Sequence, residues 1–233
     1  EQTYTNLEIL LMNDGSTDAS FDIATELSYK DSRIRLINLK HGGVSAARNA
    51  GLSNMTGDYF CFVDADDSLD LSFCEMMLSV SLQNDADMTF CKIHWIPLDR
   101  AIDETELEAV IASRSWYKFL AGVTDCQFGC VWRILYKSQT FQSNKFNEKI
   151  YIYEDLLYLL DCLTVSRNVA LCDEKLYHYM VPKGFFNKYY REDFVETCLY
   201  IGDCLEERLM RLGAEDYAKA ELLAAYCRAL SGS

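Results

Sequence analysis

Short apolar runs alternate with helical patterns along residues 7–93, and this alternation restricts the fold more than any other feature of the chain. Strand-like runs cover residues 7–12, 33–38, 59–63 and 88–93, and helical patterns cover residues 18–29, 42–52 and 71–83. Strands that alternate with helices at this spacing form an α/β sheet with parallel strands. The run 59–63 is apolar without a break, which is typical of a strand buried on both faces.

Beyond about residue 133 the pattern changes to aromatic segments and longer helices. Helical periodicity predicts helices over residues 153–163, 192–212 and 216–230. With 2 prolines and 11 glycines in 233 residues, the chain has no Pro/Gly-rich linker that would separate independent domains.

The net charge is −14, from 22 basic and 36 acidic side chains, and such a surface repels the phosphate backbone of nucleic acids. We therefore expect no nucleic-acid partner. Several of the 10 cysteines sit inside apolar runs and none forms a C-x-x-C pair, which is typical of buried thiols in a reducing compartment. The predicted location is cytoplasmic, and we expect no transmembrane segment because apolar runs of about 18 residues are missing.

An acidic cluster follows directly on the apolar run 59–63. Asp64, Asp66 and Asp67 then lie at the carboxyl end of a strand, which is where ligands bind in open α/β sheets. Carboxylate oxygens suit Mg²⁺ or Mn²⁺, which proteins bind through one or two carboxylates together with substrate phosphates. The cluster therefore predicts a site for a divalent metal and a phosphorylated ligand.

Two other interpretations of this cluster compete. Asp66, Asp67 and Ser68 are good caps for the helix that follows, so capping stays open. The EF-hand spacing is also matched, by Asp64, Asp66, Ser68, Asp70 and Glu75 at loop positions 1, 3, 5, 7 and 12. A calcium loop is disfavoured because Leu69 replaces the glycine of the sharp turn and because the preceding segment is β-like.

Three segments in order resemble glycosyltransferase family two: Asn13–Asp18 (NDGSTD), Gly43–Gly51 (GVSAARNAG) and Gly57–Asp67 (GDYFCFVDADD). Each motif alone is weak, but three in this order at ordinary spacing are specific. The resemblance implies a GT-A fold, which is a Rossmann-like mixed, mainly parallel sheet flanked by helices, here with a helical C-terminal part. It also implies transfer of a sugar from a nucleotide donor with inversion.

The resemblance assigns roles to five residues near the donor. Asp14 would contact the nucleotide base, and Arg48 and Asn49 would lie near the donor, with Arg48 as a partner of the diphosphate. Asp64 and Asp66 form the D-x-D pair that binds the donor ribose and the metal. The resemblance assigns the metal to Asp66 and Asp64, with Asp66 favoured as the direct ligand.

On the acceptor side, the resemblance points to an acidic pair that opens a helix. Asp155 is the predicted catalytic base, supported by Glu154, and Trp132 would stack on an acceptor sugar. Each has a structural alternative, because acids are favoured at any helix N-terminus and a lone tryptophan is often a core residue. The implied division is a nucleotide-sugar-binding core over residues 1–135, an acceptor-side region over 136–190 and C-terminal helices over 191–233.

The front of the chain departs from the family. Relatives begin with a strand that ends in Pro-x-Tyr-Asn and with a helix, both before the segment that matches residues 3–8. That strand lies in the middle of the family's sheet, so we expect a chain truncated at its N-terminus. A central gap leaves backbone hydrogen-bonding groups unpaired, which folded proteins avoid.

The predicted function is metal-dependent inverting transfer of a sugar from a nucleotide-diphosphate donor, a UDP-sugar, to an acceptor hydroxyl. The expected acceptor is a saccharide or a lipid-linked saccharide, and the expected process is polysaccharide biosynthesis. Peripheral attachment to the inner face of the membrane and oligomerisation are left open. The alternative is a non-catalytic module of the same fold that binds a sugar nucleotide or a partner. A nucleotidyltransferase is disfavoured, because its basic glycine-rich loop would come earlier than Gly42–Gly43.

Overall fold

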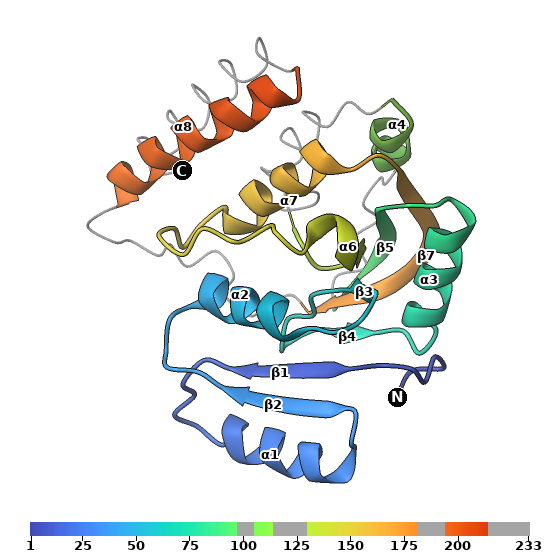
Figure 1. The fold of residues 1–233 in the computed structure, drawn as a ribbon, viewed down its shortest axis with the longest axis vertical. Helices are drawn as coiled ribbons and strands as arrows, with labels where there is room; N and C mark the ends of the chain where they lie inside the picture. The colour runs from blue at the N-terminus through green and yellow to red at the C-terminus, as the bar shows by residue number, and fades with distance from the viewer. Residues whose placement is uncertain (97–104, 114–129, 181–193, 214–233) are drawn as a thin grey trace.

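The computed structural model describes residues 1–96, 105–113, 130–180 and 194–213 (Figure 1). The strands are β1 (Ile9–Asn13), β2 (Ile34–Asn38), β3 (Tyr59–Phe60), β4 (Ser68–Leu69), β5 (Met88–Ile96), β6 (Ile134–Lys137) and β7 (Val169–Met180). The helices are α1 (Ser20–Lys30), α2 (Val44–Asn54), α3 (Phe73–Gln83), α4 (Thr105–Ser113), α6 (Ser138–Phe141), α7 (Glu154–Val165) and α8 (Phe194–Arg211). The helix predicted over residues 216–230 lies outside the described residues.

The strands form two sheets, and not one continuous sheet. β1 and β2 pair in parallel, with Ile9 opposite Ile34 and Asn13 opposite Asn38. In Figure 1 this pair lies at the bottom, with α1 below β2 and α2 above β1. Within the described ranges β1 pairs with no strand of the larger sheet, and each of its residues is only half-buried.

The larger sheet has five strands in the order β3-β6-β5-β7-β4. β5 and β7 are parallel, whereas the pairs β3–β6, β5–β6 and β4–β7 are antiparallel. The parallel pair is the longest, and it shifts register around Lys92. The predicted mixed sheet with flanking helices is thus confirmed.

Among the described residues β3 lies at the edge of the larger sheet, and the run 59–63 is less buried than predicted. Only Tyr59 and Phe60 form the strand, and β6 is its partner. Phe62 adds a single bridge to Trp132, and Val63 is 46% exposed. Phe60 and Phe62 pack against one core cluster and Tyr59 and Cys61 against another, so both faces of the run meet the core but neither is fully covered.

The main core lies between the larger sheet and α7. Most of α7 is buried: Leu156, Leu157, Tyr158, Leu159, Leu160, Cys162 and Leu163. Phe146 stacks on Tyr158 with ring centroids 4.0 Å apart, and Phe62 meets both rings edge-on. Aromatic pairs in these geometries stabilise a core beyond the area that they bury. They also fix the start of α7 relative to the segment before it.

α8 packs against α7 on the side away from the sheet (Figure 1). The Arg208 guanidinium donates to the Asp161 carboxylate at 2.6 Å and to the Leu157 carbonyl at 3.3 Å. These bonds hold α7 from its outer face. In the part of the chain that the structure describes, no helix is long and apolar enough to cross a bilayer.

Asp87 joins three segments at the base of the larger sheet. Its carboxylate accepts hydrogen bonds from the Thr140 hydroxyl at 2.7 Å and from the backbone N–H groups of Arg167 and Asn168 at 2.7 and 3.3 Å. Burial acts to raise the pKa of Asp87, but these hydrogen bonds outweigh it and lower that pKa below its ordinary value.

Replacing Asp87 by asparagine is expected to lower the free energy of unfolding by about 1–3 kcal/mol at pH 7, because three donors lose a charged acceptor that is itself buried. A lowered folded-state pKa stabilises the fold above the unfolded pKa of about 3.9, and this contribution is lost as pH falls through the folded value. The difference from wild type should therefore shrink below about pH 4. Urea unfolding of both proteins at several pH values measures this difference in the free energy of unfolding.

The matched control is Asp85→Asn. The Asp85 side chain is 83% exposed and pairs with Lys137 at 3.1 Å. Exposed pairs of this kind contribute less than about 1 kcal/mol. Equal losses for the two variants would contradict the structural role of Asp87.

Candidate active site

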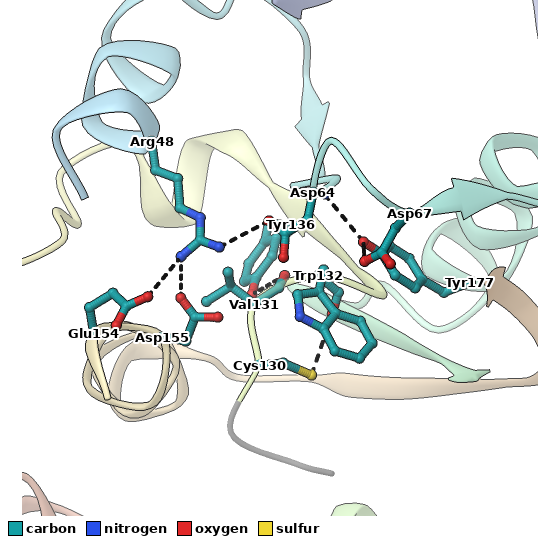
Figure 2. A network of polar contacts seen from close by, with 10 residues as sticks. All are labelled: Arg48, Asp64, Asp67, Cys130, Val131, Trp132, Tyr136, Glu154, Asp155 and Tyr177. Atoms are coloured by element: carbon teal, nitrogen blue, oxygen red, sulfur yellow. Dashed lines mark hydrogen bonds and ion pairs between the residues drawn. The ribbon is translucent and has the colours of Figure 1, made fainter. Parts of the chain in front are cut away.

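Arg48 of α2 brings together carboxylates from two distant parts of the chain (Figure 2). Its Nη2 lies 3.1 Å from Asp64 Oδ1, just beyond β3, and its Nη1 lies 3.4 Å from Glu154 Oε1. The same Nη1 also contacts Asp155 Oδ1 at the start of α7. The Arg48 side chain is 10% exposed, so these ion pairs are largely shielded from water.

The electrostatics of this cluster raise the proton affinity of Asp155. Burial, with the negative charges of Glu154 and Asp64, raises the pKa of Asp155 to about 7, against the lowering effect of Arg48. Burial acts to lower the pKa of Arg48, but the three carboxylates raise it above its ordinary value. Asp155 is thus a carboxyl group that can exchange a proton near neutral pH, beside a permanent positive charge.

α7 begins abruptly at the acidic pair. Tyr153, the residue before it, has φ 59° and ψ 12°, a left-handed conformation that is uncommon for a residue other than glycine. The helix proper starts at Glu154, so both acids lie in its first turn, where the helix dipole favours negative charge. The side chains of Glu154 and Asp155 are 15% and 20% exposed.

Phe146 lies against the Arg48 guanidinium, and Asn49 holds the backbone of Phe146. The Asn49 side-chain amide donates to the Phe146 carbonyl at 3.0 Å and accepts from the Phe146 N–H at 2.8 Å. The Phe146 ring centroid lies 5.4 Å from the Arg48 guanidinium carbon. The side-chain amide of Asn49 is thus hydrogen-bonded within the chain. Its predicted place near the donor stays a prediction.

The acidic cluster after β3 divides into two kinds of side chain. Asp67 accepts hydrogen bonds from the Tyr177 hydroxyl at 2.7 Å and from the Met180 N–H at 2.8 Å. Burial raises the pKa of Asp67, partly offset by these bonds. Asp66 is exposed and makes no hydrogen bond or ion pair with other described residues. Asp64 is 34% exposed, with Oδ1 on Arg48.

The capping interpretation of Asp66, Asp67 and Ser68 is wrong. α3 begins only at Phe73, and Ser68 belongs to β4. The N-cap position is Ser72, which makes no side-chain cap hydrogen bond, and the Asp70 carboxylate accepts the Ser72 N–H at 2.9 Å. The cluster is separated from α3 by the short strand, which no local pattern in the sequence indicated.

Asp14 follows β1 and holds the glycine loop before α2. Its carboxylate accepts the backbone N–H groups of Gly42 and Gly43, each at 2.8 Å. Gly43 has φ 87°, a conformation that L side chains rarely adopt, and α2 starts at the next residue. The Asp14 side chain is 22% exposed. Asp14 therefore has a structural role, and its contact with a nucleotide base stays a prediction.

Trp132 lies inside the second core cluster. It is 5% exposed and stacks on Tyr177 and Tyr179, with centroids 4.7 and 4.9 Å away. Its role as an acceptor contact stays a prediction, because residues 114–129 lie outside the described part of the chain. Tyr177 and Tyr179 were not predicted as site residues, although their i, i+2 spacing on a strand places both on one face.

The carboxylates near β3 suit a divalent metal that shares its ligands with a phosphorylated substrate. Among the described residues, no three His, Cys, Asp or Glu side chains converge to form a complete metal site. Asp66 has an uncommitted carboxylate, and Asp64 has one oxygen that is not on Arg48. Mg²⁺ and Mn²⁺ are commonly held by one or two carboxylates plus phosphate oxygens, so this pair fits such an ion.

Comparison with known proteins agrees with this architecture. Residues 1–155 match the model of glycosyl transferase family 2. The chain is 31% identical over 246 residues to the glycosyltransferase GlyA of Streptococcus pneumoniae, covering 100% of the chain and 34% of GlyA. It is 32% identical over 184 residues to the uncharacterized glycosyltransferase EpsJ of Bacillus subtilis, covering 76% of the chain and 54% of EpsJ. The chain therefore spans about a third to a half of the length of these curated relatives.

Solved structures share the fold. TarS of S. aureus (residues 1–349), in complex with UDP-GlcNAc, superposes with a TM-score of 0.74 at 18% identity, covering 97% of this chain and 65% of that one. The mannosyltransferase PcManGT of Pyrobaculum calidifontis, in complex with GDP-Man and Mn²⁺, gives 0.61 at 14% identity, covering 99% and 66%. The predicted GT-A fold is confirmed. Since the family model covers residues 1–155, from the first residue to the acidic pair of α7, the chain belongs to glycosyl transferase family 2.

Proposed function

We propose that this chain carries the catalytic site of an inverting, metal-dependent glycosyltransferase that uses a nucleotide-diphosphate sugar. The observation that carries the proposal is the Arg48 cluster. In this cluster the Arg48 guanidinium contacts both Asp64 and Asp155. Asp64 belongs to the D-x-D pair, and Asp155 is a carboxyl group with a raised pKa. Membership of the family supports the same reaction class.

On the donor side, Asp64 and Asp66 would hold the ribose and the metal, and Asp14 would meet the base. When bound, Mg²⁺ or Mn²⁺ supplies positive charge to the leaving diphosphate. The complexes of similar structures with UDP-GlcNAc, and with GDP-Man and Mn²⁺, support a nucleotide-diphosphate sugar, and we favour a UDP-sugar. Asp66 is the preferred metal ligand because its carboxylate is exposed and uncommitted.

On the acceptor side, Asp155 would act as the general base. It takes the proton of the acceptor hydroxyl while that oxygen forms its bond to the anomeric carbon of the sugar. The bond from that carbon to the diphosphate breaks, and its electron pair leaves with the diphosphate, so the configuration inverts. A base with a pKa close to neutral works efficiently in this role. Glu154 would support Asp155 or contact the acceptor.

The expected acceptor is the hydroxyl group of a saccharide or of a lipid-linked saccharide, with Trp132 on the acceptor side. The division into a donor-binding core over residues 1–135, an acceptor-side region over 136–190 and C-terminal helices over 191–233 belongs to this proposal. So do a cytoplasmic location, including peripheral attachment to the membrane, and a role in polysaccharide biosynthesis.

The test is a coupled assay for nucleoside diphosphate release. The chain is incubated with a panel of UDP- and GDP-sugars, Mn²⁺ or Mg²⁺, and simple saccharide acceptors. We expect metal-dependent UDP release that stops in EDTA. Nucleotide binding without any turnover would favour the non-catalytic module. The absence of both binding and turnover with all of the donors would overturn the proposal.

A further inference from the structure

We propose that Arg48 is a positioning residue for Asp155 and not a contact of the donor diphosphate, and that Asn49 and Phe146 serve the reaction by holding Arg48. This inference rests on the proposed function, because it takes Asp155 as the base. We call Arg48, Asn49 and Phe146 the arginine brace.

The two terminal nitrogens of Arg48 are already engaged in ion pairs. Both of its terminal nitrogens contact carboxylates, Nη2 that of Asp64 and Nη1 those of Glu154 and Asp155. Only 10% of the side chain is exposed. A diphosphate would have to break buried ion pairs to reach this guanidinium, and breaking such pairs leaves uncompensated charge.

One face of the guanidinium lies over an aromatic ring. Phe146 lies under it at 5.4 Å, and a cation over an aromatic ring is attracted by the ring. Asn49, the next residue of α2, bonds both backbone groups of Phe146 and so fixes that ring. The same ring stacks on Tyr158 of α7 at 4.0 Å. The brace therefore connects α2 to α7 by two routes, one ionic and one aromatic.

The brace fixes Asp155 relative to Asp64. These two carboxylates come from segments about 90 residues apart in the sequence. The Arg48 guanidinium contacts both of them. A reacting hydroxyl must lie within hydrogen-bond reach of Asp155 while the sugar lies at the D-x-D pair. Misplacement of about 1 Å costs about 100-fold in rate, so a rigid link between the two sides is a positioning device.

The experiment compares Arg48→Ala and Arg48→Lys with the exposed control Arg211→Ala, whose arginine is 58% exposed and pairs with Glu207. We expect kcat to fall about 100-fold in Arg48→Ala, with donor KM and the melting-temperature shift caused by UDP and Mn²⁺ unchanged. Added guanidinium ion should restore part of kcat in Arg48→Ala. Arg48→Lys should lose activity too, because an ammonium cannot bridge two sides as a planar fork does.

A loss of the UDP and Mn²⁺ shift, or a rise in donor KM without a change in kcat, would overturn the inference and make Arg48 a diphosphate contact. Asn49→Ala is the second arm. Asn49→Ala should lower kcat by less than Arg48→Ala does and should leave UDP binding intact. Weakened UDP binding in Asn49→Ala would count against the brace.

A third measurement is independent of turnover, so it separates failure of this inference from failure of the proposed function. Melting temperatures at pH 8 are measured for wild type, Arg48→Ala, Asp155→Asn and the double variant. If Arg48 holds the Asp155 carboxylate, neutralising Asp155 should raise the melting temperature more in the Arg48→Ala background than in wild type. Equal rises would overturn the link, and Arg48→Lys replaces Arg48→Ala if the latter does not fold.

Discussion

Asp155→Asn is expected to lower kcat by about 100- to 10,000-fold, the usual contribution of a positioned general base. Asparagine has nearly the same shape as aspartate but cannot accept the proton of the acceptor hydroxyl. UDP binding in the presence of Mn²⁺ should persist, because Asp155 lies across the guanidinium from Asp64. Steady-state UDP release and the UDP-induced thermal shift, measured on the same preparation, separate these two effects.

The pH dependence adds a second signature of Asp155. Because its pKa is raised to about 7, the wild-type kcat/KM should rise with pH through about 7, as the base loses its proton. The contribution of Asp155 to the free energy of unfolding changes with pH in the opposite direction. It is fully present below the unfolded pKa of about 3.9 and is lost as pH rises through about 7. Asp155→Asn should therefore melt above wild type at pH 8 but not at pH 4.

The control for Asp155 is Asp173→Asn on β7, whose carboxylate is 69% exposed and pairs with Lys92. It should keep both the rate and the pH profile. If Asp155→Asn retained a kcat within about threefold of wild type, the base would have to be sought elsewhere, with Glu154 first.

Asp66→Ala is expected to abolish the increase in melting temperature that UDP and Mn²⁺ give together. A ligand at 100 times its dissociation constant stabilises the folded state by about 2.7 kcal/mol, and all of this is lost when the ligand no longer binds. Without ligand the variant should be as stable as wild type to within about 0.5 kcal/mol, because Asp66 is exposed. Thermal unfolding with Mn²⁺, with UDP and with both measures the effect.

Asp58→Ala is the matched control, since Asp58 is exposed and also lies beside β3. It should keep the full shift. Persistence of the shift in Asp66→Ala would remove Asp66 as the metal ligand, and a separate Asp64→Ala variant would then show whether Asp64 alone is sufficient.

Most of the first half of the fold could be predicted from the sequence because its elements are locally regular. β1, α1, β2, α2, α3 and β5 all coincide with the apolar runs and helical patterns read from the sequence. β7 was missed over most of its length because three exposed charged residues, Asp173, Glu174 and Lys175, interrupt its apolar alternation. There the pairing with β5 also shifts register, so the strand has no simple period of two.

The candidate site could be predicted as a set of residues but not as an arrangement. Sequence motifs identified Arg48, Asp64 and Asp155, yet nothing local indicates that a guanidinium contacts carboxylates 16 and 107 residues away. Asn49 likewise forms its bonds with Phe146, at a separation of 97 residues. Such contacts depend on how the fold brings α2 close to Phe146 and to the start of α7, which only the tertiary structure supplies.

The strand order of the larger sheet also constrains when this site can form during synthesis. β3 pairs with β6 and β4 pairs with β7, so the segment carrying Asp64 and Asp66 has both of its strand partners more than 70 residues downstream. Pairings at such separations carry a large loop-closure cost and form late. On the ribosome, β1, β2 and their helices can associate early, whereas the aspartates gain a fixed position only after β7 has emerged.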